Sequence, residues 1–82
     1  MPAQTLFLCQ PYSVGQKGHL RSETPVLARD ATAAKLRAER MIGAGSKIVG
    51  VDVVQQEVDA EAGDYSEPVF LARLGRVPEL HH

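Results

Sequence analysis

The chain has 82 residues, with nine lysines and arginines against ten aspartates and glutamates, and a formal net charge of −1 at pH 7. This length is enough for one domain and too short for two. A near-neutral charge disfavours a nucleic-acid-binding protein, and no apolar run approaches the roughly 20 residues of a membrane span. We therefore expect one domain over residues 1–82, with a disordered tail at 78–82 and neither nucleic acid nor membrane as a partner.

The N-terminal segment lacks the features of a targeting signal. Its apolar run, residues 6–9, has no positive charge before it and is shorter than the roughly 7–15 apolar residues of a signal peptide. Cys9 is the only cysteine, which excludes a disulfide within the chain and is typical of a reducing compartment. Both observations predict a cytoplasmic protein.

The first expected elements are a strand and a long loop. Residues 5–10 are rich in β-forming side chains and are bounded by prolines, which predicts a strand that ends before Pro11. Residues 11–25 contain two prolines and two glycines and predict a loop. A short edge strand near residues 19–22 fits within it, because Pro25 would end its pairing.

A helix is expected next, at residues 31–42. Asp30 is placed to cap it, because a carboxylate accepts hydrogen bonds from the free N–H groups of the first turn. Gly43 and Gly45 end it. At 100° per residue, one apolar stripe collects Ala31, Ala34, Ala38, Met41 and Ile42. Since this stripe is mostly alanine, the helix is expected to approach its support closely, with Leu36 nearly opposite.

Two further strands complete the pattern. Residues 47–58 are dense in β-branched side chains, and residues 68–74 form a second apolar run that Gly75 and Pro78 close. The acid-rich segment 59–67 between them is too short for a crossover, so the two strands are expected to form a hairpin. The expected fold class is α+β, with one helix packed on a three- to four-stranded, mostly antiparallel sheet.

Both faces of this sheet are expected to be apolar, because side chains alternate between the faces of a strand. One helix covers one face, so the other is left for residues 11–28 or for a second copy of the chain. Strict alternation, with Leu36 added from the outer helix face, gives an expected dimer interface of Phe7, Leu36, Ile48, Val54, Phe70 and Leu74.

Charge is divided unevenly along the chain. Residues 1–50 carry a net charge of +4 and residues 51–82 a net charge of −5. Such a split can steer two copies together, or the charges can intermix on the surface of one domain. The basic side chains of the helical region are either a solvated face or a site for phosphate or an acidic partner: Arg29, Lys35, Arg37, Arg40 and Lys47.

No residue set predicts catalysis, a cofactor or a metal site. Cys9 and His19 have the chemistry of a thiol nucleophile and its base, but the apolar strand around Cys9 favours core packing. The acidic segment from Glu57 to Glu67 offers oxygen ligands for a hard cation, yet its spacing does not fit an EF-hand loop. A solvated hairpin tip is the preferred interpretation.

A resemblance covers roughly residues 5–78. The run Ala28-Arg29-Asp30-Ala31, the later Ala38-Glu39-Arg40, and Gly63-Asp64-Tyr65 before Glu67-Pro68-Val69 resemble short uncharacterised bacterial proteins of strand–helix–strand–strand layout. The matching positions are caps, packing alanines and turns. The resemblance therefore implies a fold, and no activity comes with it.

The expected function is a non-enzymatic protein-interaction module that acts as a homodimer. The alternative is a small-molecule-binding protein or an accessory subunit of an enzyme. Its pocket would lie between the long loop and the sheet, with Tyr12, His19 and Arg21 as the polar groups.

Overall fold

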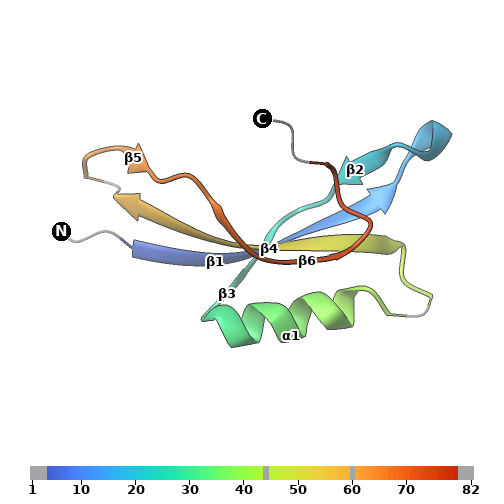
Figure 1. The fold of residues 1–82 in the computed structure, drawn as a ribbon, viewed down its shortest axis with the longest axis horizontal. Coiled ribbons are helices and arrows are strands. Elements are labelled where there is room, and N and C mark those ends of the chain that lie inside the picture. Colours follow the sequence, from blue (N-terminus) through green and yellow to red (C-terminus); the bar gives the residue numbers. More distant parts are fainter. Residues whose placement is uncertain (1–3, 44, 60, 80–82) are drawn as a thin grey trace.

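In the computed structural model one α-helix lies on one face of a curled antiparallel sheet (Figure 1). The structure describes residues 4–43, 45–59 and 61–79, and the elements below are those of this part of the chain. The predicted tail at 78–82 lies mostly outside it. In chain order the elements are β1 (Gln4–Val14), the 3₁₀ turn η1 (Gln16–Gly18), β2 (Leu20–Ser22), β3 (Val26–Ala28), α1 (Ala31–Met41), β4 (Ile48–Asp59), β5 (Asp64–Tyr65) and β6 (Val69–Gly75).

The two longest strands, β1 and β4, form the middle of the sheet and pair along almost their whole length. Both β2 and β3 pair with the free edge of β1, and both β5 and β6 pair with the free edge of β4. The six described strands therefore occupy four positions across the sheet, which we call lanes: β2 with β3, then β1, then β4, then β5 with β6. Every pairing is antiparallel. The α+β class is confirmed, whereas the sheet has more strands than the expected three or four because each outer lane is split in two.

The split between β2 and β3 explains why β1 continues through Pro11, where the sequence predicts its end. The carbonyl of Pro11 accepts a hydrogen bond from the Glu23 N–H, so the ring nitrogen of Pro11, which has no hydrogen, faces the same break in the outer lane. The sheet therefore loses no backbone hydrogen bond at Pro11. The Gln10 side-chain amide donates to the Glu23 carbonyl at 2.7 Å, and Ser13 Oγ lies 2.6 Å from the Glu23 carboxylate.

Helix α1 begins as the sequence predicts. The Asp30 carboxylate accepts a hydrogen bond from the Ala33 N–H at 2.7 Å, which satisfies one free donor of the first turn. Ala34 and Ala38 are 0% exposed, so the alanine stripe does pack closely on the sheet. The helix ends at Met41, one residue before the predicted end.

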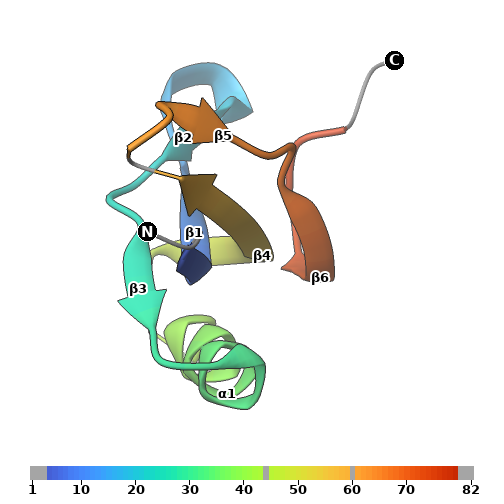
Figure 2. The same cartoon turned by 90° about the vertical axis from the view of Figure 1, so that its left-hand side faces the viewer.

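The core lies between this stripe and the middle of the sheet. Its fully buried members are Cys9, Ala34, Ala38, Val51 and Val53, and partly buried residues surround them, among them Phe7, Ile48, Leu71, Ala72 and Leu74. Helix α1 lies below the sheet in Figures 1 and 2, while the ends that carry β2 and β5 rise on the other side.

The structure corrects the expected assignment of side chains to faces. Phe7, Ile48 and Leu74 pack against the core under the helix, and Val54 and Phe70 lie on the opposite face. Strict alternation fails at two extra residues, Val49 of β4, which the register with β1 skips, and Leu71 of β6, which the register with β4 skips. Each extra residue shifts the following side chains to the other face.

Two glycines allow the end of β6 to cross close to β4. A Cβ on Gly50 would lie 1.7 Å from the carbonyl oxygen of Arg76, and a Cβ on Gly75, whose φ is +67°, would lie 2.3 Å from that of Val49. The Arg76 N–H donates to the Val49 carbonyl at 2.8 Å. This contact fixes where the chain turns after β6.

Gly50→Ala is therefore expected to lower the free energy of unfolding by about 1–3 kcal/mol, because backbone atoms have to move to admit the methyl group. Urea denaturation measures the loss. Gly43→Ala is the matched control, since the nearest atom to its Cβ lies at an ordinary 3.5 Å. An equal effect of the two substitutions would contradict the close approach at Gly50.

Candidate functional site

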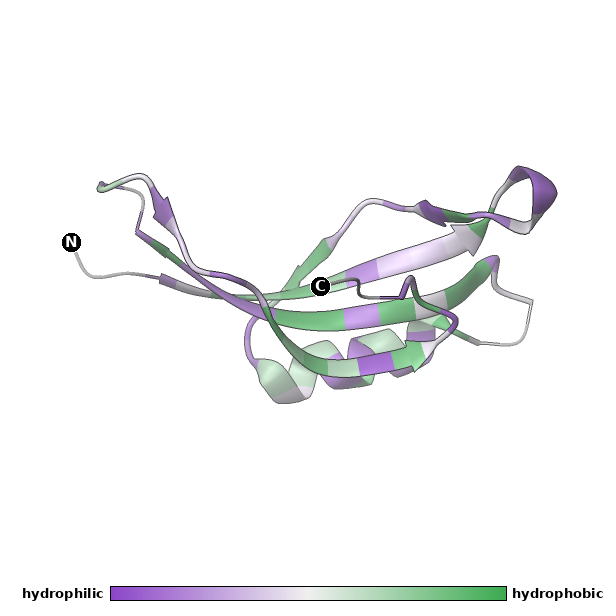
Figure 3. Cartoon of the chain, turned by 45° about the horizontal axis from the view of Figure 1, so that its top comes forward, coloured by the Kyte–Doolittle hydropathy of each residue, from purple (hydrophilic) through white to green (hydrophobic). Residues whose placement is uncertain are grey.

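The sheet face opposite α1 carries a row of apolar side chains that crosses all four lanes. Leu27 lies opposite Leu8, Leu8 opposite Val54, and Val54 opposite Phe70; directly opposed residues share a face. The ends of the row are the most open, with Leu27 63% and Phe70 37% exposed, whereas Val54 is 8% exposed. Figure 3 shows the apolar stretches on the strands of this sheet. We call these four residues the apolar row.

A buried carboxylate lies beside the apolar row. Asp52 is 2% exposed, and its Oδ1 accepts a hydrogen bond from Arg73 Nε at 2.7 Å. The Tyr12 hydroxyl donates to Oδ2 at 3.2 Å. Ion pairing and hydrogen bonding together offset the cost of removing this charge from water. These contacts join β1, β4 and β6.

The surroundings of Tyr12 alter its acidity. Burial raises the pKa of the Tyr12 phenol above its ordinary value, the neighbouring charge of Asp52 raises it further, and Arg73 opposes both. The neutral phenol, which donates to Asp52, is thus the form that the folded chain favours.

Arg73 connects this cluster to the end of the chain. Its guanidinium lies 4.9 Å from the centroid of the Phe70 ring, within the range of a cation–π contact, and it also donates to the Pro78 carbonyl. Arg73 thereby orients the exposed Phe70 ring and holds the segment after β6. Among the described residues no buried polar atom of this cluster lacks a hydrogen-bond partner, which indicates a structural role.

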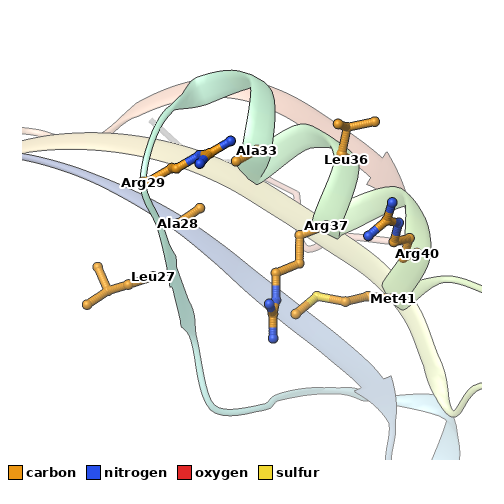
Figure 4. Close-up of a pocket in the computed structure, with 8 residues that line it drawn as sticks. All are labelled: Leu27, Ala28, Arg29, Ala33, Leu36, Arg37, Arg40 and Met41. Atoms are coloured by element: carbon orange, nitrogen blue, oxygen red, sulfur yellow. The ribbon is translucent and has the colours of Figure 1, made fainter.

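A second feature is a groove of about 620 Å³ between the outer side of α1 and β3 (Figure 4). Its residues are Leu27, Ala28, Arg29, Ala33, Leu36, Arg37, Arg40 and Met41, and we call it the basic groove. Leu36 is 50% exposed. Arg29 lies 3.5 Å from Asp30, whereas no carboxylate among the described residues is within ion-pair distance of Arg37 or Arg40. The groove thus combines unneutralised positive charge with exposed leucines.

The acidic segment forms a hairpin at the edge of the sheet opposite the edge that carries β3. It joins β4 to β5, and we call its described residues, 57–59 and 61–67, the acidic hairpin. The Asp59 carboxylate accepts a hydrogen bond from the Ala62 N–H at 3.2 Å, and Ser66 Oγ accepts one from the Glu57 N–H at 2.9 Å. Its exposed side chains include Glu57, Asp64, Tyr65 and Glu67. Among described residues no group of three or more potential metal ligands occurs.

The polar residues that the sequence suggests for a ligand pocket are not brought together. Tyr12 is bonded to Asp52, while His19 and Arg21 are exposed near η1 and on β2. Tyr12 and Arg21 occupy successive register pairs of β1 and β2, so their side chains point to opposite faces of the sheet. Neither the basic groove nor the acidic hairpin includes any of the three.

Sequence reasoning missed the pairing of Asp52 with Arg73. A signal was present: each is a lone charge inside an apolar run, of opposite sign, in the two strands that were expected to form a hairpin. The hairpin register places them directly opposite each other.

Comparison with known proteins gives no match: no family model fits the chain, and no curated protein or solved structure is significantly similar to it. In the described part of the chain no helix has the length and apolar character needed to cross a membrane.

Cys9 is expected to react slowly with a thiol reagent in the native protein. Its side chain is 0% exposed, and Sγ donates to the Ala34 carbonyl at 3.1 Å. Burial raises the pKa of the thiol, an effect that Arg37 partly opposes, so the reactive thiolate is scarce. Labelling with and without denaturant measures the protection, and equal rates would contradict the burial of Cys9.

Tyr12→Phe is expected to lower the free energy of unfolding by about 1 kcal/mol at pH 7, because Asp52 loses a donor. The Tyr12 pKa is higher in the folded than in the unfolded chain. The stabilisation that the Tyr12 hydroxyl contributes is therefore fully present below the ordinary tyrosine pKa of about 10, and it disappears as the pH rises through the pKa of Tyr12 in the folded chain. Denaturation of both proteins at pH 7 and above 10 measures this, with Tyr65→Phe as the exposed control. A difference that grows with pH would contradict the role of Tyr12.

Proposed function

We propose that the chain is a non-enzymatic protein-interaction module that acts as a homodimer through the sheet face opposite α1. The observation that carries this proposal is the apolar row, which ends in the exposed side chains of Leu27 and Phe70. Burying one large apolar side chain stabilises an interface by about 1.5–3 kcal/mol. A second copy offers the same row, so a twofold contact of this face with itself is self-complementary.

The arrangement of Phe70 supports the proposal further. Its ring is held by Arg73, which is itself fixed to the buried Asp52. A side chain that is already oriented loses less conformational freedom on binding than a mobile one. Among the sequence-predicted interface residues, Val54 and Phe70 belong to this face, and Leu36 to the basic groove. Phe7, Ile48 and Leu74 contribute inside one copy instead, under the helix.

Phe70→Glu tests the proposed dimer. We expect the wild-type chain to have twice its 8.9 kDa mass at micromolar concentration, and the variant to have the monomer mass, because a carboxylate would be buried in the contact. Light scattering coupled to size-exclusion chromatography measures both.

Val14→Glu is the matched control, since Val14 is 44% exposed and lies in β1 well away from the apolar row. Its mass is expected to equal that of the wild type. A wild-type mass near 8.9 kDa at high micromolar concentration would overturn the proposed function, as would an unchanged dimer in Phe70→Glu.

A further inference from the structure

The apolar row alone is too small for a stable interface. A typical specific contact buries about 800 Å² on each partner, whereas two of the four side chains in the row are already largely covered within one copy. A dimer of this chain therefore needs a second area of contact. The basic groove is open, carries unneutralised charge and includes the exposed Leu36, so it is a surface that can supply such an area.

From this arrangement we infer that the acidic hairpin of one copy docks in the basic groove of a second copy. The inference rests on the proposed homodimer and names its second contact. The two surfaces are complementary in charge, with Arg37 and Arg40 on one and Glu57, Asp64 and Glu67 on the other. The apolar parts match as well, because the hairpin presents Tyr65 at 69% exposure and the groove presents Leu36 at 50%.

The contact has to form between copies, because the sheet separates the two surfaces within one chain. The groove lies along β3, in the outer lane beside β1, and the hairpin ends in β5, in the opposite outer lane beside β4. Figures 1 and 2 both show β5 on the side of the sheet away from α1. Leu27 lines the basic groove and also ends the apolar row, so the groove borders the proposed dimer face, and in a twofold dimer the hairpin contact forms twice.

The chemistry of the hairpin suits this occupant. Arginine guanidinium groups form planar hydrogen bonds with carboxylates and stack on aromatic rings. The hairpin offers both kinds of partner close together, the carboxylates of Asp64 and Glu67 and the ring of Tyr65. The charge split between the two halves of the sequence then follows from function, since one half supplies the groove and the other the hairpin.

A complementary pair of charge-reversed variants tests the inference. The groove variant carries Arg37→Glu and Arg40→Glu, and the hairpin variant carries Asp64→Lys and Glu67→Lys. Each alone sets like charges against each other and is expected to self-associate at least tenfold more weakly than the wild type at low salt. In an equimolar mixture both contacts are again between opposite charges, so association is expected to return to within about threefold of the wild type. Sedimentation equilibrium measures each dissociation constant.

Matched controls separate the proposed contact from attraction by net charge. The first control carries Lys35→Glu and Lys47→Glu and changes the net charge by as much as the groove variant. The second carries Glu39→Lys and Glu79→Lys and changes it by as much as the hairpin variant. None of these four residues contributes to either surface. These controls are expected to retain the wild-type dissociation constant. Circular dichroism establishes that each variant is folded. If the groove variant unfolds, the hairpin variant, whose replaced side chains are exposed, still tests the inference through its expected tenfold weaker self-association.

The outcomes distinguish this inference from the proposed function. A wild-type dimer that Phe70→Glu dissociates, but that neither charge-reversed variant weakens, would overturn the inference and leave the proposed function standing. Equal weakening by the control variants, or no recovery in the mixture of folded variants, would also overturn it. A wild-type monomer would overturn the proposed function, and the hairpin contact with it.

Discussion

The close packing of Ala34 and Ala38 on Cys9, Val51 and Val53 is the contact on which the rest of the structure depends. Alanine has no side chain beyond Cβ, so α1 lies near enough to the sheet to exclude water from all five residues. The helix has 11 residues and a length of about 16 Å. It covers one face of the sheet, and the opposite face has to be stabilised by other means.

That opposite face combines two kinds of interaction. Asp52, Tyr12 and Arg73 join three neighbouring strands through polar contacts, and the apolar row crosses beside them. A buried ion pair contributes little to stability compared with apolar packing, but it strongly disfavours any register in which its partners are separated. The polar cluster therefore specifies the pairing of β4 with β6, while the two ends of the apolar row, Leu27 and Phe70, stay exposed.

The sequence was sufficient for the elements whose signals are local. The Asp30 cap, the alanine stripe, the β-branched run of β4 and the hairpin before β6 all lie where caps, composition and turn residues predict them. The continuation of β1 through Pro11 was not predictable in this way, because proline is tolerated there only by a break in the neighbouring lane. The residues of a lane break come together only in the folded chain.

The same limit applies to the candidate site. The sequence predicts a ligand contact for Tyr12, and no local pattern reveals that its hydroxyl donates to Asp52, which is 40 positions away in the chain. The assignment of Ile48 and Val54 to one face failed because a single irregularity in register inverts every later side chain. Such irregularities depend on the partner strand, and no pattern within β4 alone reveals them.

The pairing of β1 with β4 also has a consequence for how the chain reaches its native state. Every pair in this central ladder, from Ser13 with Ile48 to Gln4 with Val58, joins residues from opposite halves of the chain. A long loop has to close before any of these bonds forms, and its entropy is lost before the hydrogen bonds compensate for it. Chains dominated by such non-local contacts fold on the scale of milliseconds to seconds. The α1 segment, capped by Asp30, can form beforehand from local interactions.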